Sequence, residues 1–328
     1  MKKNEMPKKK NAGRRFMIIF LIVVLVFLPV SNAIGYEMVF HFLFLDEMRD
    51  IEKNEAEEKS FLEAQGLVRT TMDITTASGR ADDEKQAGKL KAFLYMTKEA
   101  ADRTGGESLG CENLIVFSHG IGNGHIAYLD LLGELAGLDN TAVLAYDATG
   151  NGQSDGKANG GLPQGIKDLD RVLNYVESDP YFSDADITLV GHSWGAYSAG
   201  SVLEFHPEIE KAVLIAGFNA SENMLQSYSQ KYVGPVVYVL LPYVELYEMI
   251  KFGRFGNASI VRGCLQSGTS VTYVQALDDA RVDPEKFGLR YLQKELSEDE
   301  DVTFIELESG GHTLPVPTVM EIVRPVVE

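Results

Sequence analysis

Short apolar runs and helix-type patterns alternate along the chain from about residue 67 to the carboxyl end, and this alternation limits the possible folds. Strands that alternate with helices form a largely parallel sheet with helices on both faces. The apolar runs are nearly continuous, as expected for strands buried on both faces. The pattern predicts eight strands, at residues 67–76, 89–96, 113–117, 142–146, 187–190, 212–216, 271–274 and 302–305. It predicts helices at about 126–137, 164–178, 195–206 and 284–297, and from residue 317 onward.

One connection between the predicted strands is much longer than a crossover needs. A parallel crossover requires roughly a dozen residues, whereas about fifty separate the strand that ends near Gly217 from the one that begins at Ser270. This insertion, about residues 218–268, is rich in aromatic and aliphatic side chains, so we expect it to pack against the body. A lid over a site at the carboxyl edge of the sheet is the functional interpretation. A helical elaboration without a role in access is the alternative.

The composition is that of a folded protein, because 45% of the 328 residues are hydrophobic and 24% are charged. A chain of this length buries enough apolar surface to fold without a metal or disulfide. The two cysteines, Cys111 and Cys264, cannot form a disulfide scaffold or a four-ligand zinc site, and we expect free buried thiols. The formal net charge of -18 would repel phosphate backbones, so no nucleic-acid partner is expected.

The amino terminus carries a targeting segment. Residues 1–15 hold seven Lys and Arg side chains against a single Glu, and an uncharged apolar run begins directly after them at Phe16. Basic residues stay on the cytoplasmic side, which predicts a cytoplasmic tail at 1–15 and an extracytoplasmic body. Residues 16–36 are long enough for a transmembrane anchor, since a span needs roughly 20 residues. We therefore expect a single-pass protein of the cell membrane.

Cleavage of this segment is the alternative. Pro29 interrupts the apolar run, and the small residues Ser31 and Ala33 offer a cleavage site, as in a signal peptide that releases a secreted protein. We favour the anchor, because apolar character continues past Ala33 and cleavage would expose that stretch. Residues 37–65 are expected to form a polar, solvated stalk that leads into a single folded domain at 66–328.

The strongest local signal is the sequence G-H-S-W-G at residues 191–195, directly after a buried strand and directly before a helix. A sharp strand-to-helix turn needs small residues where the backbone crowds itself, and it exposes the middle side chain at the top of the sheet. Ser193 would also sit at a helix amino terminus, whose amides favour developing negative charge. This context predicts a nucleophilic serine. A serine that only caps the helix is the alternative.

A hydroxyl nucleophile needs a base, and His312 is the best placed of the six histidines. It lies in a glycine-containing loop directly after the last predicted strand, where an imidazole can reach the site. The other five are expected near the membrane, in turns or at helix ends, with His192 pointing away along its turn. An acid must orient the base, and Asp278 and Asp279 both follow the seventh strand. One is expected to accept from His312, and the other to cap the turn or face Arg281.

The order Ser193, Asp279, His312, each just after a predicted strand, resembles the α/β-hydrolase superfamily, whose triad runs nucleophile, acid, histidine. The resemblance extends from about residue 67 to the carboxyl end. It includes S-H-G-I at 118–121, similar to the oxyanion turn of that family, and D-A-T-G-N-G-Q-S at 147–154, similar to its D-x-R-G-x-G-x-S stretch. Within the superfamily the chain is most similar to the monoacylglycerol-lipase and serine-aminopeptidase-like group, including its membrane-anchored bacterial members.

This resemblance implies the α/β-hydrolase fold with a helical lid, and it implies further site residues. In the family's G-x-x-D-x-x-V pattern, Ala276 replaces the glycine and Asp279 aligns with the acid. Thr149 replaces the arginine of the D-x-R-G stretch, which removes a supporting contact. The backbone amides of Ile121 and Trp194 would form the oxyanion hole for the tetrahedral intermediate. The Trp194 side chain itself is expected to pack at the start of the helix.

The sequence lacks the patterns of a nucleotide or metal site. The glycines at 120–124 lack the third glycine of G-x-G-x-x-G, because His125 stands there, and residues 150–157 lack the spacing of a phosphate loop. His119 and His125 have no cysteine or carboxylate cluster beside them in the sequence. No cofactor and no metal are therefore expected.

These patterns predict a serine hydrolase that cleaves a carboxylic ester, in a small-molecule or lipid-like substrate, through an acyl-enzyme intermediate. An aminopeptidase or prolyl peptidase of the same fold is the nearest alternative, and Glu222, Glu245 and Glu248 in the insertion could hold a substrate ammonium. A catalytically inactive binding protein of the same fold is the second alternative. Nothing in the sequence indicates the oligomeric state.

Overall fold

All eight predicted strands join one sheet in the computed structural model, which describes residues 10–42, 51–75, 88–103 and 108–328. Their order across the sheet is β1-β2-β4-β3-β5-β6-β7-β8. The strands are β1 (Leu67–Ile74), β2 (Leu90–Thr97), β3 (Asn113–Ser118), β4 (Thr141–Tyr146), β5 (Asp186–His192), β6 (Lys211–Ile215), β7 (Ser270–Ala276) and β8 (Val302–Leu307). The sequence pattern therefore located every strand of this sheet.

The sheet is mostly parallel. β2 pairs antiparallel with both β1 and β4, and the pairings that join β4, β3, β5, β6, β7 and β8 are parallel. The carboxyl ends of parallel strands meet at one edge of a sheet. The turns that carry Gly120, Ser193, Asp279 and His312 all leave from this edge, because they follow β3, β5, β7 and β8.

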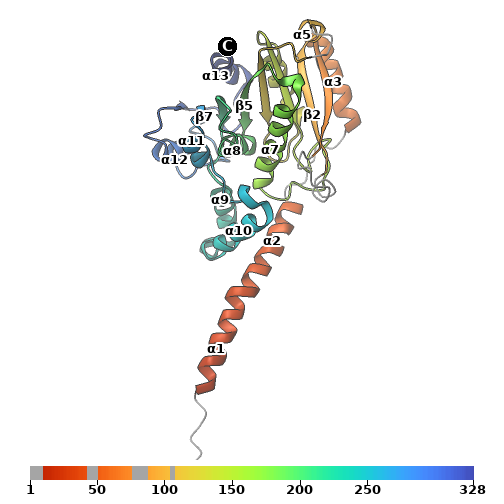
Figure 1. Cartoon of the computed structure of the whole chain (residues 1–328). Coiled ribbons are helices and arrows are strands. Elements are labelled where there is room, and N and C mark those ends of the chain that lie inside the picture. The colour runs from red at the N-terminus through yellow and green to blue at the C-terminus, as the bar shows by residue number, and fades with distance from the viewer. Residues whose placement is uncertain (1–9, 43–50, 76–87, 104–107) are drawn as a thin grey trace, which may run out of the picture.

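Successive side chains of the central strands enter two different cores. In β3, Leu114 and Val116 pack on one face of the sheet, and Ile115 and Phe117 pack on the other, as the two-residue period of a strand requires. The first face is covered by α7 (Pro163–Ser178), α8 (Trp194–Val202) and α12 (Leu289–Glu295), and the second by α6 (Leu129–Ala136) and α13 (Val316–Val327) (Figure 1). The short helices α5 (Lys98–Arg103), η2 (His125–Tyr128) and η3 (Pro180–Phe182) lie in connections.

The polar helix α3 (Ile51–Gln65) packs against the body, which differs from the solvated stalk expected over residues 37–65. Its Glu58 is buried, and the carboxylate accepts hydrogen bonds from Tyr95 and Arg69. Phe61 packs on the second core beside Gly133 of α6. A helix rich in Glu and Lys carries no hydropathy signal for a single buried and paired carboxylate, so the pattern suggested solvent exposure. Residues 43–50 of the expected stalk lie outside the described residues.

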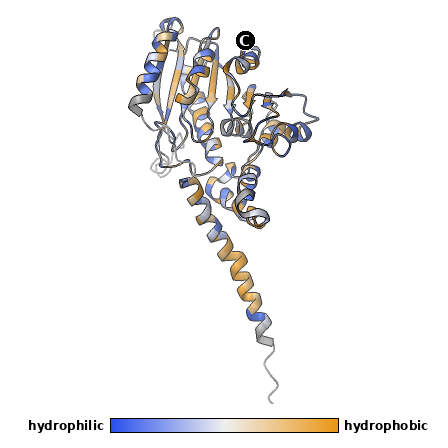
Figure 2. Ribbon diagram, turned by 180° about the vertical axis from the view of Figure 1, so that it is seen from behind, coloured by the Kyte–Doolittle hydropathy of each residue, from blue (hydrophilic) through white to orange (hydrophobic). Residues whose placement is uncertain are grey.

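The amino-terminal apolar segment forms one long helix. It consists of α1 (Lys10–Ile22), the π-helical turn η1 (Val23–Phe27) and α2 (Leu28–Phe42). The stretch Gly13–His41 is long and apolar enough to cross a membrane, and its most apolar window is not buried in the protein (Figure 2). Pro29 does not end the helix: it is the second residue of α2, directly after the π-turn, and the helix continues to Phe42. Ser31 Oγ donates to the Phe27 carbonyl at 2.8 Å.

The insertion after β6 is helical. It contains α9 (Ser221–Val233), η4 (Gly234–Val236), α10 (Val237–Phe252), η5 (Gly253–Phe255) and α11 (Ile260–Ser267). We refer to residues 218–268 as the lid. Helices α9 and α10 lie beyond the carboxyl edge of the sheet, and α10 lies beside the end of α2 (Figure 1). The edge that carries the predicted site residues is therefore also the edge nearest to the amino-terminal helix.

Candidate active site

Ser193 lies in a strained turn between β5 and α8. Its φ of 56° is in the left-handed region that residues with a β-carbon rarely adopt. Its amide donates to the Ile215 carbonyl at 2.8 Å, which fixes the turn to the neighbouring strand. A β-carbon on Gly191 would collide with the backbone of Gly195, and one on Gly195 would collide with the backbone of Ser118. Both glycines of G-x-S-x-G are thus required by this turn, which presents the serine at the amino terminus of α8.

His312 reaches Ser193 from the loop after β8. His312 Nε2 lies 2.8 Å from Ser193 Oγ, although 119 residues separate the two in the sequence. The loop turns back at Gly310 and Gly311, whose φ angles of 152° and 67° favour glycine. A neutral imidazole has one acceptor nitrogen, so Nε2 accepts from the serine hydroxyl when Nδ1 carries the proton.

Asp279 binds the other nitrogen of His312. His312 Nδ1 lies 2.9 Å from Asp279 Oδ2 and 3.1 Å from Oδ1. Oδ1 also accepts from the amides of Arg281 at 2.8 Å and Val282 at 3.0 Å, and Oδ2 accepts from Gln275 Nε2 at 3.0 Å. Burial raises the pKa of Asp279, but the hydrogen bonds from His312 and Gln275 outweigh it and hold the pKa below its usual value. This carboxylate is ionised and fixed in position.

The neighbouring carboxylate, Asp278, accepts hydrogen bonds from backbone amides and not from the imidazole. Its Oδ1 accepts from the amides of Gly310 at 3.0 Å and Gly311 at 2.8 Å. These bonds fix the loop that carries His312. The residues by themselves left the roles of the two aspartates open, and the family resemblance aligned Asp279 with the acid. In the structure Asp279 binds the ring and Asp278 binds the loop.

The two amides predicted for the oxyanion hole border the serine. Trp194 follows Ser193 directly, and Ile121 lines the same cavity as Ser193. Neither amide has a hydrogen-bond partner among the described residues, so both are available to a ligand oxygen. The Trp194 side chain is buried and its Nε1 donates to the Leu162 carbonyl at 2.7 Å, which is a packing role.

A second hydrogen-bond chain joins the turn after β3 to the loop of His312. Tyr128 Oη accepts from the Gly120 amide at 3.0 Å and lies 2.8 Å from His192 Nδ1. His192 Nε2 lies 2.9 Å from the His312 carbonyl. Burial lowers the pKa of His192 to about 4, so its ring is neutral. The one consistent arrangement has Tyr128 donating to Nδ1 and Nε2 donating to the carbonyl.

His192 does not point away from the site, contrary to the expectation from the sequence, and it lines the cavity with Ser193 and His312. Sequence reasoning missed both His192 and Tyr128 as site residues. No local pattern could have found them, because the pairing of Tyr128 with His192 spans 64 residues and that of His192 with the His312 backbone spans 120.

A cavity of about 370 Å³ lies over Ser193 and His312. This volume is in the range of sites for small ligands. Two lid residues, Met224 and Tyr228 of α9, contribute to its wall, together with the charged side chains of Asp130 and Arg281. The apolar part of the wall includes Ile121, Leu131, Ile215, Leu314, Val316 and Val319, and Asn123, Tyr128, His192 and Thr313 add polar groups.

Two further buried histidines, His119 and His125, contact the turn that begins at Asp147, one of the stretches similar to the α/β-hydrolase pattern. His119 Nε2 accepts from a backbone amide at 2.9 Å, and His125 Nδ1 lies 2.8 Å from Asp147 Oδ1. Thr149, at the position where the resembling family has arginine, donates through its amide and hydroxyl to Asp168, at 2.7 and 2.9 Å. The carboxylate of Asp168 therefore anchors this turn without the arginine.

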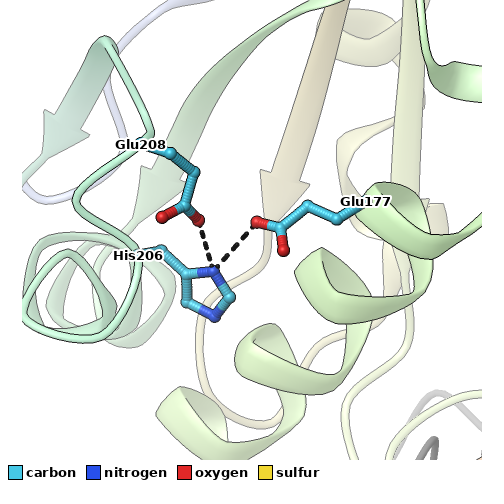
Figure 3. A group of neighbouring side chains, drawn as sticks. All are labelled: Glu177, His206 and Glu208. Atoms are coloured by element: carbon cyan, nitrogen blue, oxygen red, sulfur yellow. Dashed lines mark hydrogen bonds and ion pairs between the residues drawn. The ribbon is translucent and has the colours of Figure 1, made fainter.

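His206 lies between Glu177 and Glu208, just beyond the end of α8 opposite Ser193 (Figure 3). Its Nδ1 lies 2.7 Å from Glu208 Oε1 and 3.2 Å from Glu177 Oε1, and its Nε2 lies 3.2 Å from Asp170 Oδ1. Burial lowers the pKa of His206, but the hydrogen bonds to Asp170 and Glu208 raise it to about 9. Both ring nitrogens then donate to carboxylates, which leaves no lone pair for a metal. The cluster is an ion-pair network.

Solved structures with low sequence identity share this fold. An esterase from Pyrococcus furiosus has a TM-score of 0.56 at 18% identity, covering 80% of this chain and 90% of its own. An α/β-hydrolase from Vibrio vulnificus has a TM-score of 0.62 at 15% identity, covering 89% of this chain and 92% of its own. Est1E from Butyrivibrio proteoclasticus, solved with ferulic acid bound, has a TM-score of 0.55 at 18% identity, covering 77% of this chain and 96% of its own.

The sequence match is more specific than the structural ones. None of the curated proteins matches the chain, whereas residues 111–284 match the family described as serine aminopeptidase, S33. This span covers more than half of the chain and includes Ser193 and Asp279 with the turns that hold them. The fold, the serine turn and this match agree, and the chain belongs to the serine aminopeptidase S33 family of α/β-hydrolases.

Proposed function

We propose that this chain is a serine hydrolase that cleaves a carboxylic ester through an acyl-enzyme intermediate. One observation carries the proposal: Ser193 Oγ lies 2.8 Å from His312 Nε2, while His312 Nδ1 lies 2.9 Å from Asp279. The three side chains lie at the wall of a cavity that fits a small ligand. The esterases among the solved structures of this fold support an ester as the substrate.

In the acylation step, Ser193 Oγ attacks the ester carbonyl carbon while His312 Nε2 takes the hydroxyl proton. The carbonyl oxygen becomes an oxyanion, which the free amides of Ile121 and Trp194 stabilise. Asp279 keeps the Nδ1 proton in place and stabilises the imidazolium, and it stays ionised itself. The tetrahedral intermediate then collapses, and His312 gives the proton to the leaving alcohol.

In the deacylation step, a water molecule takes the place of the alcohol. His312 Nε2 accepts a proton from the water as its oxygen attacks the acyl carbon. The second tetrahedral intermediate breaks the bond to Ser193 Oγ, which recovers its proton from His312. The acid leaves and the resting site returns.

The volume of the cavity and the apolar residues in its wall support an acyl group of moderate length, as in a medium-chain ester or a monoglyceride. This wall includes the apolar side chains of Leu131, Ile215, Met224 and Val319. The rate with p-nitrophenyl esters is expected to rise from acetate toward longer chains, because each buried methylene contributes about 0.8 kcal/mol. A rate that falls steadily from acetate to decanoate would contradict an apolar acyl pocket.

A membrane-anchored form is part of the proposal. The helix of residues 10–42 follows a basic terminus and runs without a break through Ser31 and Ala33, the candidate cleavage site. The basic residues favour a cytoplasmic amino terminus and a hydrolase domain outside the cell membrane. The test is the mass of the mature protein from membranes washed with carbonate: the full-length chain is expected there, and release of a shorter chain into the medium supports the secreted form.

Peptide-bond cleavage is the second candidate function, and the family description favours it. An aminopeptidase would need a carboxylate near Ser193 to bind the substrate ammonium. The lid carboxylates Glu222, Glu245 and Glu248 do not line the cavity over Ser193, and Glu248 accepts from Ser221 Oγ at 2.7 Å instead. Asp130 of α6 is the acidic residue that lines this cavity, together with Arg281. We rank the ester first because of the aliphatic residues in the same wall and the esterases among the solved structures of this fold. Turnover of aminoacyl-naphthylamides faster than that of p-nitrophenyl esters would reverse this order.

The decisive test of catalysis compares the full-length chain with Ser193→Ala on the same esters. Loss of the nucleophile is expected to lower kcat on the order of 10⁴-fold or more. Equal rates would contradict the proposal. If neither protein turns over any ester or amide, and the biological effect survives Ser193→Ala, the inactive binding protein becomes the better interpretation.

A further inference from the structure

The lid contains an apolar segment whose described residues the protein covers only in part. Residues 232–244 include no charged side chain. A run of this length is typical of a buried core helix or of a segment at a membrane surface. The structure excludes the core, because Val236, Tyr238 and Val239 are 57%, 52% and 59% exposed. The apolar surface continues along α10, where Leu246, Met249 and Ile250 are also exposed.

Helix α10 is fixed directly to the amino-terminal helix. Asn32 Nδ2 donates to the Leu240 carbonyl at 3.5 Å, and Tyr36 Oη donates to Glu248 Oε1 at 2.6 Å. Tyr36 and Phe40 of α2 are buried, whereas residues 13–22 of α1 are exposed. The lid and the apolar helix therefore form one structural unit.

The charges at the far end of this contact mark where the apolar surface stops. Glu37 of α2 is the first acidic residue after the uncharged run that begins at Phe16, and it pairs with Lys251 at the end of α10. Tyr247 Oη also donates to Glu37, at 2.7 Å. Lys251 Nζ in turn donates to the Gly160 carbonyl of the body at 2.7 Å. These polar contacts lie at the end of α10 next to the body, and the exposed side chains of Val236, Tyr238 and Val239 lie at its other end.

The register of these contacts sets the depth of α10 along the apolar helix. A span of roughly 20 residues that starts after Arg15 ends near Gly35. Asn32 lies three residues before that point, which is about 4.5 Å inside it at 1.5 Å per residue. Leu240 lies at the level of Asn32, and both helices run in the same direction, because Asn32 and Tyr36 contact Leu240 and Glu248 in that order. Residues 236–239 therefore lie at least as deep as Leu240.

We propose that the exposed face of α10, with the turn of residues 234–236 before it, is embedded in the outer interface of the lipid bilayer beside the amino-terminal anchor. The occupant of this apolar surface is phospholipid. Helices at a membrane surface bury their apolar face about 5–10 Å into the boundary between headgroups and acyl chains. Tyrosines are enriched at this level, and Tyr238 and Tyr243 lie in this part of the lid.

This placement also names the class of substrate, an inference that rests on the proposed hydrolase function. Helix α9, which precedes the embedded turn, contributes Met224 and Tyr228 to the cavity over Ser193. Tyr228 is 40% exposed, so the wall of the cavity continues to the surface of the lid. The substrate is then an amphiphilic lipid ester that moves from the bilayer into the cavity over Ser193, and its acyl chain enters the cavity before its polar group.

The membrane contact can be measured without any enzymatic activity. A nitroxide is attached to Val239→Cys in the full-length chain, which is reconstituted in phosphatidylcholine vesicles. The matched control is Leu265→Cys on α11, where an equally exposed leucine (60%) lies outside the proposed surface. The native Cys111 and Cys264 are buried, and the wild-type chain gives their background labelling. Collision rates with oxygen and with a water-soluble nickel chelate report the depth of each label.

The label at Val239 is expected to collide more with oxygen and the label at Leu265 more with the nickel chelate. Equal and water-like collision rates at the two positions would overturn the proposed surface. The kinetic arm uses Val239→Asp, which is expected to lower hydrolysis of a monoacylglycerol in vesicles about fivefold or more, while p-nitrophenyl acetate in water is cleaved as fast as by the wild type. Unchanged hydrolysis in vesicles would overturn delivery from the bilayer. If the wild type cleaves neither ester, the proposed function is overturned. The nitroxide depths do not depend on activity, so they would still test the membrane contact.

Discussion

Asp278 and Asp279 are adjacent in the sequence, and their carboxylates do different work: Asp279 accepts from the His312 ring, and Asp278 accepts from the backbone that carries that ring. We predict that Asp279→Asn lowers kcat for a short ester by about 10³- to 10⁴-fold, because the ring loses the partner that holds its productive tautomer. Steady-state kinetics on p-nitrophenyl butyrate measures this.

Asp278→Asn is the matched control, since an amide oxygen can still accept from the Gly310 and Gly311 amides. It is expected to lower kcat by less than about tenfold. If Asp278→Asn were the more damaging change, the assignment of the triad acid would be wrong.

Tyr128 is predicted to position the site through its hydroxyl. In Tyr128→Phe, the Gly120 amide and His192 Nδ1 each lose a partner, and a buried polar group left unsatisfied costs about 1–3 kcal/mol. We expect kcat to fall about tenfold or more while KM changes little, because the loops that carry Ile121 and His312 are no longer held in fixed positions relative to each other. Tyr175→Phe, which lies on α7 outside the cavity wall, provides the control. Equal kinetics for the two variants would contradict a positioning role.

The ion-pair network of His206 predicts a pH dependence of stability. The pKa of His206 is raised from 6.5 to about 9 in the folded chain. A raised pKa means that the charged ring stabilises the fold fully below about pH 6.5 and loses this effect as the pH rises through about 9. The Tm of His206→Gln is therefore expected to fall well below that of the wild type at pH 6, with a smaller difference at pH 9.5. A difference that stays constant or grows with pH would contradict the network.

Helix α3 is predicted to be part of the folded domain. Glu58→Ala leaves Arg69 and His125 without their buried carboxylate and is expected to lower the free energy of unfolding by about 3–5 kcal/mol. Glu63→Ala, an exposed glutamate on the same helix, is expected to change it by less than about 0.5 kcal/mol. Urea titrations of both variants in detergent micelles measure the difference. Equal midpoints would indicate a solvated stalk.

The strands and the serine turn were predictable because their signals are local. Both-face burial makes β3 and β4 continuous apolar runs, and the crowding around Ser193 demands glycines two residues before and after it. Local signals could not choose between Asp278 and Asp279, because both follow the same strand and differ only in where their side chains reach; only the family pattern selected Asp279.

Features that depend on long-range pairing left no trace in the sequence. The buried Glu58 looks like its exposed neighbours on α3, and its partner Tyr95 lies 37 residues away. The contact of Tyr36 with Glu248 joins segments 212 residues apart, and two apolar helices carry no pattern that specifies which other helix each contacts. Such pairings follow from the packing of the whole chain.

Labelling of the full-length chain in detergent micelles with a fluorophosphonate probe tests the central claim most directly. The probe reacts with a serine hydroxyl that an adjacent base activates, and Ser193 Oγ lies 2.8 Å from His312 Nε2. The account predicts strong labelling of the wild type, none of Ser193→Ala and weak labelling of His312→Ala. A folded wild-type chain that stays unlabelled, or a Ser193→Ala chain that labels as strongly as the wild type, would contradict it.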